Sequence, residues 1–412
     1  MRLTAGPRPA RAPVPGLLRT VYLPRGADAG ASAMTTYGIP LLVLATTGSA
    51  SLTGLAFALE WIPRLSAFAV AGAMVDRYGT TAVFRLASAV RALVVLAAAL
   101  VLPAQTDGPA ATVTVMVLAG ASGVLTEFSY VAAETAGGTA SRAAGGAAHR
   151  VQSVLFGIDQ VSTLAGPALA GVLLERSGPA GMLLTTAGFS LLAAGLAPRQ
   201  PAPATASSAR VVKGLRTGWS ALRSLPALAW LVAGLVVSNL SVGVLQAATP
   251  VIVVKELGHS SADVGLVWSA AAVASLITVT LCRTAIDRWG LWPVGALSGT
   301  LAAGATLAVA QARTYSTYLV LIAVLMAGEG GLTVVLRTLR SRLIPAGTFS
   351  ATLSLTILLL LLPFPFAGLL VAAVPPEHLG HVITGCAIFQ ALGLATAFTR
   401  LRDLPGLRAA HP

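Results

Sequence analysis

Charged side chains are scarce in this sequence of 412 residues, where Asp, Glu, Lys and Arg together make up 10%. Soluble proteins carry about 25% charged residues. The shortage, combined with 56% hydrophobic residues, excludes an ordinary soluble domain and indicates a chain built for the lipid bilayer. Cysteine is also rare, since only Cys282 and Cys386 are present and both fall within apolar runs. We therefore expect neither a disulfide nor a metal–thiolate site.

Several chemical motifs are missing as well. No phosphate-cradling glycine loop that ends in Lys-Ser or Lys-Thr is present, which argues against direct use of ATP. No nucleophile with a neighbouring base marks a membrane face, so we expect neither an enzyme nor a bound cofactor. Glu377, His378 and His381 cluster in one loop, but solvated surface explains them better than a metal site. The net charge of +13 is spread over many short segments, which argues against nucleic acid as a partner.

What the sequence does contain is a series of apolar runs. A helix needs about 20 apolar residues to cross about 30 Å of hydrocarbon, and twelve stretches are suitable. The predicted spans are 17–46, 52–74, 82–103, 111–133, 150–174, 180–197, 227–250, 262–283, 291–311, 317–338, 350–373 and 381–399. The sequence therefore predicts twelve transmembrane helices.

Lysine and arginine test this count, because they collect in the cytoplasmic loops of membrane proteins. With a cytoplasmic N-terminus, 22 of the 27 basic residues fall in inside segments, and Arg91 is among them. Only Arg176, Lys255 and Arg313 fall outside, while two arginines lie within spans. The pattern predicts a multi-pass protein of the cell membrane with both termini in the cytoplasm.

A stretch rich in Pro, Ala and Ser divides the spans into two sets of six. The predicted parts are a disordered cytoplasmic lead at 1–16, an N-terminal bundle at 17–197, a cytoplasmic linker at 198–226 with a surface helix at 209–223, a C-terminal bundle at 227–399 and a cytoplasmic tail at 400–412. Because six is even, both bundles run the same way through the membrane. We expect them to be related by an axis along the membrane normal.

A motif of Asp-Arg-aromatic-Gly occurs twice, as VDRYGT at 75–80 and as IDRWGL at 286–291. Asp76 and Asp287 are 287 − 76 = 211 residues apart, close to half of the chain. Gly54 and Gly265 share this offset. The spacing predicts two copies of one unit. Both copies fall in predicted cytoplasmic turns, after the second and the eighth span.

The first copy resembles the Gly-x-Leu-x-Asp-Arg-x-Gly-Arg-Arg signature of the major facilitator superfamily. The residues that carry the resemblance in the two copies are Gly72, Asp76, Arg77 and Gly79, and Asp287, Arg288 and Gly290. The resemblance implies the fold of that superfamily, an all-α membrane protein with twelve transmembrane helices in two pseudo-symmetric six-helix bundles. It also implies that the loop is a cytoplasmic latch, in which an aspartate caps a neighbouring helix in one conformation only. A turn that merely sets topology is the alternative.

The fifth predicted span contains a second pattern, SVLFGIDQVSTLAGPALAG at 153–171. It is similar to Gly-x8-Gly-x3-Gly-Pro-x2-Gly-Gly of the drug-antiporter branch, of which Gly166, Pro167 and Gly171 are retained. IPLLV at 39–43 and TGS at 47–49 are similar to stretches in siderophore and drug exporters. This resemblance, which covers the first 175 residues well, favours export over uptake. Ordinary packing of small residues between helices is the alternative.

Five carboxylates fall within the predicted spans, namely Asp28, Glu60, Glu127, Asp159 and Glu329. Each would cost about 2.5–3.5 kcal/mol if it were charged against lipid. Each must therefore face a cavity, find a partner or bind a proton. Glu60 and Arg64 are four residues apart, and Arg25 and Asp28 are three apart. We expect both pairs to be satisfied within their own helix, with a role in transport as the alternative.

Glu127 and Glu329 are the stronger candidates for proton coupling, because neither has a basic residue near it in its own span. The resemblance implies that the first, fourth, seventh and tenth spans line a central cavity. Burial disfavours the charged form of a carboxylate, which suits a group that loads and releases a proton. A helix end that points to water is the alternative. The further candidates are Asp28 and Glu60 for proton coupling, and Tyr37, Arg64, Tyr130, Asn239, Gln246 and Trp268 for the cavity.

The sequence thus predicts a secondary transporter that rocks two bundles about a central site. The favoured function is export of a small amphiphilic molecule, such as a drug or a siderophore, in exchange for protons. Uptake by proton symport is the alternative within this class, and a non-transporting sensor or a membrane-embedded enzyme is the alternative outside it. The expected partners are a small-molecule substrate, protons and lipid, and we expect a monomer.

Overall fold

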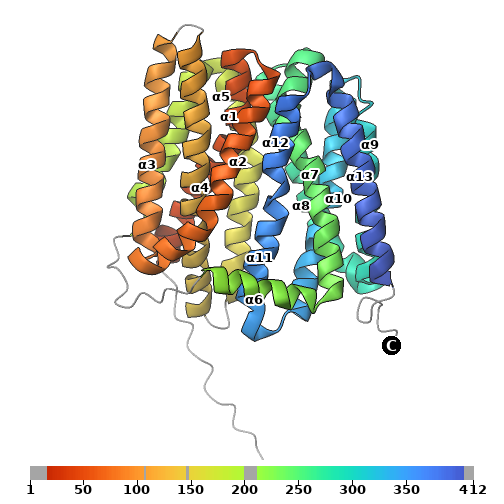
Figure 1. Cartoon of the computed structure of the whole chain (residues 1–412). Coiled ribbons are helices and arrows are strands. Elements are labelled where there is room, and N and C mark those ends of the chain that lie inside the picture. Colours follow the sequence, from red (N-terminus) through yellow and green to blue (C-terminus); the bar gives the residue numbers. More distant parts are fainter. Residues whose placement is uncertain (1–15, 106–107, 145–147, 199–210, 403–412) are drawn as a thin grey trace, which may run out of the picture.

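The computed structural model describes residues 16–105, 108–144, 148–198 and 211–402, and these residues form helices joined by short turns. The helices are α1 (Leu23–Thr47), α2 (Ala50–Tyr78), α3 (Thr80–Val101), α4 (Pro109–Ala143), α5 (Ala148–Leu196), α6 (Val211–Arg223), α7 (Pro226–Val251), α8 (Ser261–Trp289), α9 (Leu291–Val309), α10 (Tyr315–Leu343), α11 (Phe349–Leu361), α12 (Pro363–Ala373) and α13 (Leu379–Arg402). α1 to α5 lie on one side of the molecule and α7 to α13 on the other (Figure 1).

Ten helical segments among the described residues are long and apolar enough to cross a bilayer, or eleven if the bent helix α2 counts as one span, with α5 counted once. A straight helix with the 49 residues of α5 would be about 74 Å long, more than twice the thickness of the hydrocarbon. The helix is broken at Gly178, whose φ of 68° is left-handed, so α5 holds two passes. α11 and α12 together form one span, Ala351–Ala373. The predicted twelve-helix architecture is confirmed.

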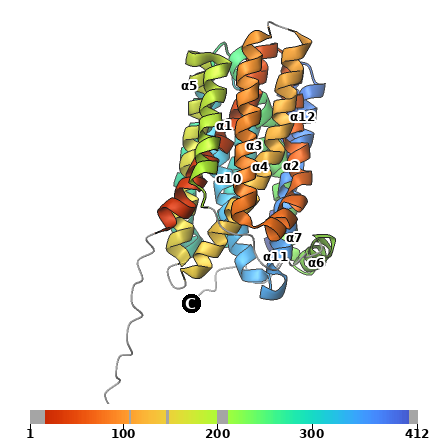
Figure 2. The ribbon, with the colours of Figure 1, turned by 90° about the vertical axis from the view of Figure 1, so that its left-hand side faces the viewer.

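The even number of passes brings the start of α1 and the end of α13 to the same end of the molecule, which we term the lower end (Figures 1 and 2). α6 lies across this end and matches the surface helix predicted at 209–223. It packs on α11 through Gly218, where an added Cβ would collide with the backbone of Ala351. The predicted lead at 1–16 and tail at 400–412 lie largely outside the described residues.

The 211-residue offset extends over two whole helices. α2 and α8 each contain 29 residues, and each begins after a serine whose hydroxyl accepts a hydrogen bond from the backbone three residues on, Ser49 and Ser260. Each also ends at a glycine with positive φ, 89° at Gly79 and 88° at Gly290. Only glycine adopts this conformation without strain, so the glycine of the repeated motif is explained by the turn that it makes.

The two bundles meet in matching crossings towards the upper end, α2 against α12 and α5 against α8. A Cβ at Gly54 would collide with the backbone of α12, and a Cβ at Gly265 would collide with the backbone of Pro167 in α5. Close approach of this kind is what small residues provide between membrane helices. Ser269 Oγ reinforces the second crossing by donating to Leu164 O at 2.6 Å.

Replacement of Gly265 by alanine tests this crossing. The added methyl group has no room, and overpacking of this kind costs about 1–3 kcal/mol. The matched control is Gly304→Ala in α9, where nothing lies within 4 Å of the added Cβ. We expect Gly265→Ala to lower the midpoint of thermal unfolding in detergent and Gly304→Ala to leave it unchanged or raise it. Equal midpoints for the two variants would contradict the crossing.

Candidate functional site

Two adjoining hollows lie between the bundles, towards the lower end. The inner hollow has a volume of about 240 Å³ and is lined by residues of α1, α5, α8 and α10. The outer hollow has a volume of about 460 Å³ and is lined by residues of α1, α4, α5 and α10. Phe156 and Arg337 line both. Since both bundles contribute to its walls, this region is the candidate functional site.

A contact between the bundles separates the two hollows. The guanidinium carbon of Arg337, in α10, lies 5.5 Å from the ring centroid of Phe156, in α5. A cation over an aromatic face at this distance is attracted by the ring quadrupole. We term this pair, which lines both hollows, the partition. Neither residue was singled out from the sequence, because Phe156 is one phenylalanine among many apolar residues and Arg337 was assigned to a loop.

The inner hollow has an aromatic wall. Tyr37 of α1 and Trp268 of α8 have ring centroids 5.4 Å apart, and each comes from a different bundle. Apart from Arg337, the polar residues that line this hollow are uncharged, and they are Gln160, Thr163, Ser275 and Thr333. The structure thus places two of the predicted aromatic cavity residues together. Tyr130, the third, lies in the outer hollow.

An ion cluster lines the outer hollow. Arg25 donates to Asp159 at 2.9 and 2.6 Å and also to Glu134, so two helices supply its partners. The prediction that Arg25 pairs with Asp28 in its own helix is therefore wrong. Glu134 was missed because the predicted fourth span ended one residue before it, whereas α4 continues to Ala143.

Asp28 instead binds Arg91, and both side chains are buried inside the N-terminal bundle. Arg91 Nη2 donates to Asp28 Oδ1 at 2.6 Å, and its other nitrogens donate to Ser32, Ser129 and Ser190. These partners belong to α1, α4 and α5, so one guanidinium in α3 ties four helices together. The assignment of Arg91 to a cytoplasmic segment was wrong, and Asp28 has a structural partner rather than a place at the cavity.

Glu60 and Glu127 lie on either side of Arg64. Arg64 Nε donates to Glu127 Oε2 at 2.9 Å, which joins α2 to α4. The expected pairing of Arg64 with Glu60 within one helix is not the hydrogen bond that forms, although the two charges interact electrostatically. Glu60 is completely buried, and its Oε1 accepts from Thr36 at 3.0 Å. Glu60 Oε2 and Glu127 Oε1 are both buried without a hydrogen-bond partner.

Trp61 connects this charge cluster to the other bundle. Its ring is stacked on Phe364 of α12, with centroids 4.4 Å apart. The guanidinium carbon of Arg64 lies 4.5 Å from the centroid of the same Trp61 ring. A displacement of Arg64 would therefore alter the packing of Trp61 on Phe364, at the contact between α2 and α12.

Glu329 occupies a different environment, inside the C-terminal bundle. Its carboxylate accepts from Ser238 of α7 and from Gln390 of α13, the latter at 3.4 Å. Gln390 also donates to Ser238 at 2.7 Å. Glu329 takes part in no ion pair among the described residues, and it does not line the two hollows. Asn239 donates to Leu360 O at 2.7 Å and Gln246 is buried, so neither lines them either.

The repeated motif lies at the lower end of α2 and α8. Asp76, Arg77, Asp287 and Arg288 are exposed, and none belongs to an ion pair between described residues. No described side chain caps the start of α3 or α9, and neither aspartate makes a hydrogen bond to another described residue, so the expected latch contact is not made in this conformation. Gly72 has open space around it.

The antiporter-like residues in α5 make helix contacts. A Cβ at Gly166 would collide with Ala33 of α1, and one at Gly171 would collide with Ser261 at the start of α8. The backbone of Pro167 lies against Gly265, across the two bundles. The structure gives this stretch the packing role that was the alternative, and the crossing of α5 with α8 depends on it.

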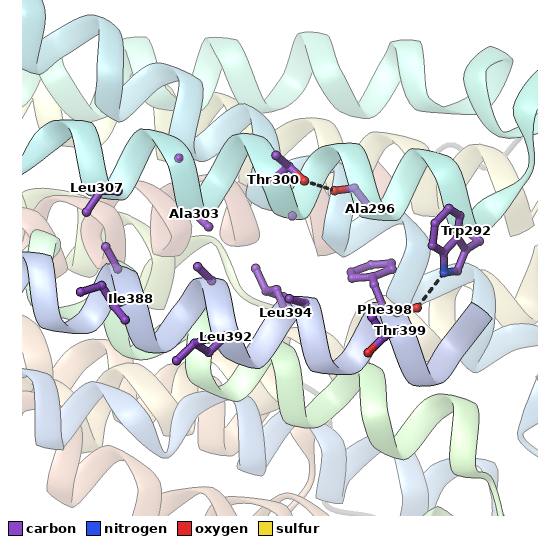
Figure 3. A pocket seen from close by; sticks show the side chains of 15 residues that line it. Trp292, Ala296, Thr300, Ala303, Leu307, Ile388, Leu392, Leu394, Phe398 and Thr399 are labelled. Atoms are coloured by element: carbon purple, nitrogen blue, oxygen red, sulfur yellow. Dashed lines mark hydrogen bonds between the residues drawn. The ribbon is translucent and has the colours of Figure 1, made fainter. Parts of the chain in front are cut away.

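Another hollow lies on the outer side of the C-terminal bundle. It is a groove of about 510 Å³ between α9 and α13, closed at one end by Trp292 and Phe398 (Figure 3). Trp292 Nε1 donates to Phe398 O at 2.8 Å. Leu307, Ile388 and Leu392 along its rim are exposed, as expected for side chains that face lipid. No charged side chain lines it, so it is not the candidate site.

Comparison with known proteins assigns the family. The sequence model of the Major Facilitator Superfamily matches residues 26–394. The chain belongs to this superfamily. It is therefore a secondary transporter rather than an enzyme, a membrane protein with many spans that carries a small molecule. No curated protein sequence matches it.

Solved structures of other transporters have the same fold. A bacterial homologue of the iron transporter ferroportin in the inward-facing state is 18% identical, with a TM-score of 0.71 over 96% of this chain and 100% of the other. A D-xylose–proton symporter is 16% identical, with a TM-score of 0.71 over 94% and 97%. A nucleoside transporter is 11% identical, with a TM-score of 0.69 over 92% and 99%. Such low identity shows a common fold and leaves the substrate open.

The buried pair of Arg91 and Asp28 gives a test of the transporter's framework. Asp28→Asn leaves an uncompensated cation among four helices, and loss of one partner of a buried pair costs about 3–5 kcal/mol. We expect a large drop in the thermal midpoint for Asp28→Asn, and a smaller further loss when Arg91→Gln is added. Arg85→Gln, in the same helix as Arg91, is the control and should have little effect. Additive losses for the two substitutions would show that the residues act independently.

Proposed function

We propose that this transporter exports a small amphiphilic molecule, such as a drug or a siderophore, in exchange for protons. The observation that carries the proposal is the arrangement of Glu60, Arg64 and Glu127. Two buried carboxylates share one guanidinium, within the bundle that forms one wall of the central site. One cation can neutralise only one carboxylate fully, so burial favours the protonated form of the other carboxylate.

The proposal also assigns the lower end to the cytoplasm. α2, α4, α8, α10 and α13 run downward, and each has arginine in its last turn. α1, α3, α7, α9 and α12 run upward, and none of them has a basic residue there. Arginine and lysine collect on the cytoplasmic side of membrane proteins. The hollows towards the lower end then belong to an inward-facing conformation.

In the proposed coupling, Arg64 is the side chain that moves between the two carboxylates. With Arg64 on Glu127, Glu60 has one unpartnered oxygen and holds the proton. Loss of that proton leaves an anion four residues from Arg64 on the same helix, which draws the guanidinium towards Glu60. The stack of Arg64, Trp61 and Phe364 carries this shift to the crossing of α2 with α12. Protonation thereby biases the opening of the upper end.

In the export cycle, the substrate enters from the cytoplasm through the outer hollow. The bundles then rock, so that the glycine-lined crossings at the upper end separate and the lower end closes. We propose that closure brings Asp76 and Asp287 into their latch contacts. The carboxylate pair takes up a proton from outside as the substrate leaves, and it releases the proton inside before the next substrate binds.

Substitution of the carboxylates tests the proton site without knowledge of the substrate. Glu60→Gln removes the group that holds the proton. We expect the pH-dependent infrared band of a buried protonated carboxyl to disappear in Glu60→Gln and to shift in Glu127→Gln. Glu256→Gln, exposed at the upper end, is the control and should leave the band unchanged. An identical band in all three variants would refute the assignment to Glu60.

The direction of transport requires oriented vesicles. Right-side-out and inside-out membrane vesicles, each with an imposed pH gradient, are supplied with ethidium and 2-naphthoate as cationic and anionic amphiphilic probes. Export by proton exchange predicts accumulation in inside-out vesicles that are acidic inside. Accumulation only in right-side-out vesicles that are acidic outside would establish uptake by symport instead. The Glu60→Gln variant should accumulate the probes in neither kind of vesicle.

A further inference from the structure

Arg337 lies at the boundary of the two hollows and pairs with no acidic side chain among the described residues. Arg25, the other arginine that lines them, is neutralised by Glu134 and Asp159. Arg337 is exposed to the hollows and takes part in no ion pair between described residues. Its guanidinium lies over the face of Phe156. The positive charge on this wall of the site is therefore available to a ligand.

A second unpaired arginine adds to this charge. Arg340 lies three residues further along α10, and only 8% of its surface is exposed. Its Nε and Nη2 atoms are buried without a hydrogen-bond partner, and its charge interacts with that of Arg337. Two like charges without a counter-ion raise the local potential, which attracts anions into a cavity walled by low dielectric. Glu134 and Asp159 share the single charge of Arg25, so together with Arg337 and Arg340 the group keeps a net charge of 3 − 2 = +1.

The apolar side of the site is the aromatic wall of the inner hollow. Tyr37 and Trp268 present their rings beside Ala271, Ala272 and Met326, without a charged group other than Arg337. Planar apolar ligands are bound well by such aromatic walls. Arg337 lines the same hollow, from the part of α10 nearer the lower end.

We propose that the substrate of this transporter is an amphiphilic organic anion. Its carboxylate or phosphate binds Arg337, and its flat apolar part lies against Tyr37 and Trp268. This inference rests on the proposed function, and it names the class of molecule that the site takes. The anion draws Arg337 away from Phe156, which removes the partition and joins the two hollows. The joined space has the size of a typical small-molecule site.

Binding of matched probes to the whole protein in nanodiscs tests the proposal. The probes are 2-naphthoate, its neutral analogue 2-naphthamide and the cation 2-naphthylmethylammonium, which share one ring system and differ in charge. We expect 2-naphthoate to bind most tightly by calorimetry. Arg337→Gln should weaken 2-naphthoate binding about tenfold to hundredfold, since it removes a charge-assisted hydrogen bond, and should leave 2-naphthamide unchanged. Arg337→Lys should restore part of the loss.

Arg342→Gln is the matched control, because Arg342 lies exposed in the last turn of the same helix and lines neither hollow. It should not change the affinity for any probe. Preference for the cation, an anion affinity that is insensitive to Arg337→Gln, or no binding of 2-naphthoate would overturn the proposal. Thermal midpoints show whether each variant is folded. The infrared test of Glu60 uses no ligand, so proton coupling and substrate class can fail separately.

Discussion

The need to neutralise charge inside the membrane organises the N-terminal bundle. Arg25, Arg64 and Arg91 lie within it, and each is bound by a carboxylate from another helix. Removal of one partner would leave an ion in a medium that solvates it poorly, so these contacts fix the relative positions of α1 to α5. Arg91 serves only this structural purpose. Arg25 does the same at the edge of the outer hollow, and Arg64 has a second carboxylate within reach.

The C-terminal bundle has the same arrangement of helices, but its buried charged groups are paired differently. α8 repeats the caps and the length of α2, and both helices cross the opposite bundle through a glycine. The charged groups inside it lack opposite charges: Glu329 is held by Ser238 and Gln390, and Arg340 has unpartnered nitrogens. The repeat therefore supplies a symmetric hinge. In the proposed cycle this difference in charge gives the two bundles different roles, proton coupling in one and anion binding in the other.

Features that depend on one helix or on regular spacing could be predicted from the sequence. Apolar runs define the twelve passes, and the offset of 211 residues identified α2 and α8 as copies. Charge partners could not be predicted in this way, because helical spacing finds neighbours only within one helix. Arg64 and Glu127 are 63 residues apart, and Arg25 and Asp159 are 134 apart. Arg91 lies in the middle of an apolar run, which could have indicated that it has a buried partner. It was instead counted among the cytoplasmic arginines.

In the proposed cycle the two bundles rock about the site, so that one end closes as the other opens. Distances between spin labels measure this directly, with one pair at Gln105→Cys and Gln311→Cys near the upper end and another at Arg142→Cys and Arg342→Cys near the lower end, after replacement of Cys282 and Cys386. If the bundles move in this way, a change of pH will shift the two distance distributions in opposite directions, and Glu60→Gln will abolish the pH response. Distances that stay constant, or that change in the same direction at both ends, would contradict it.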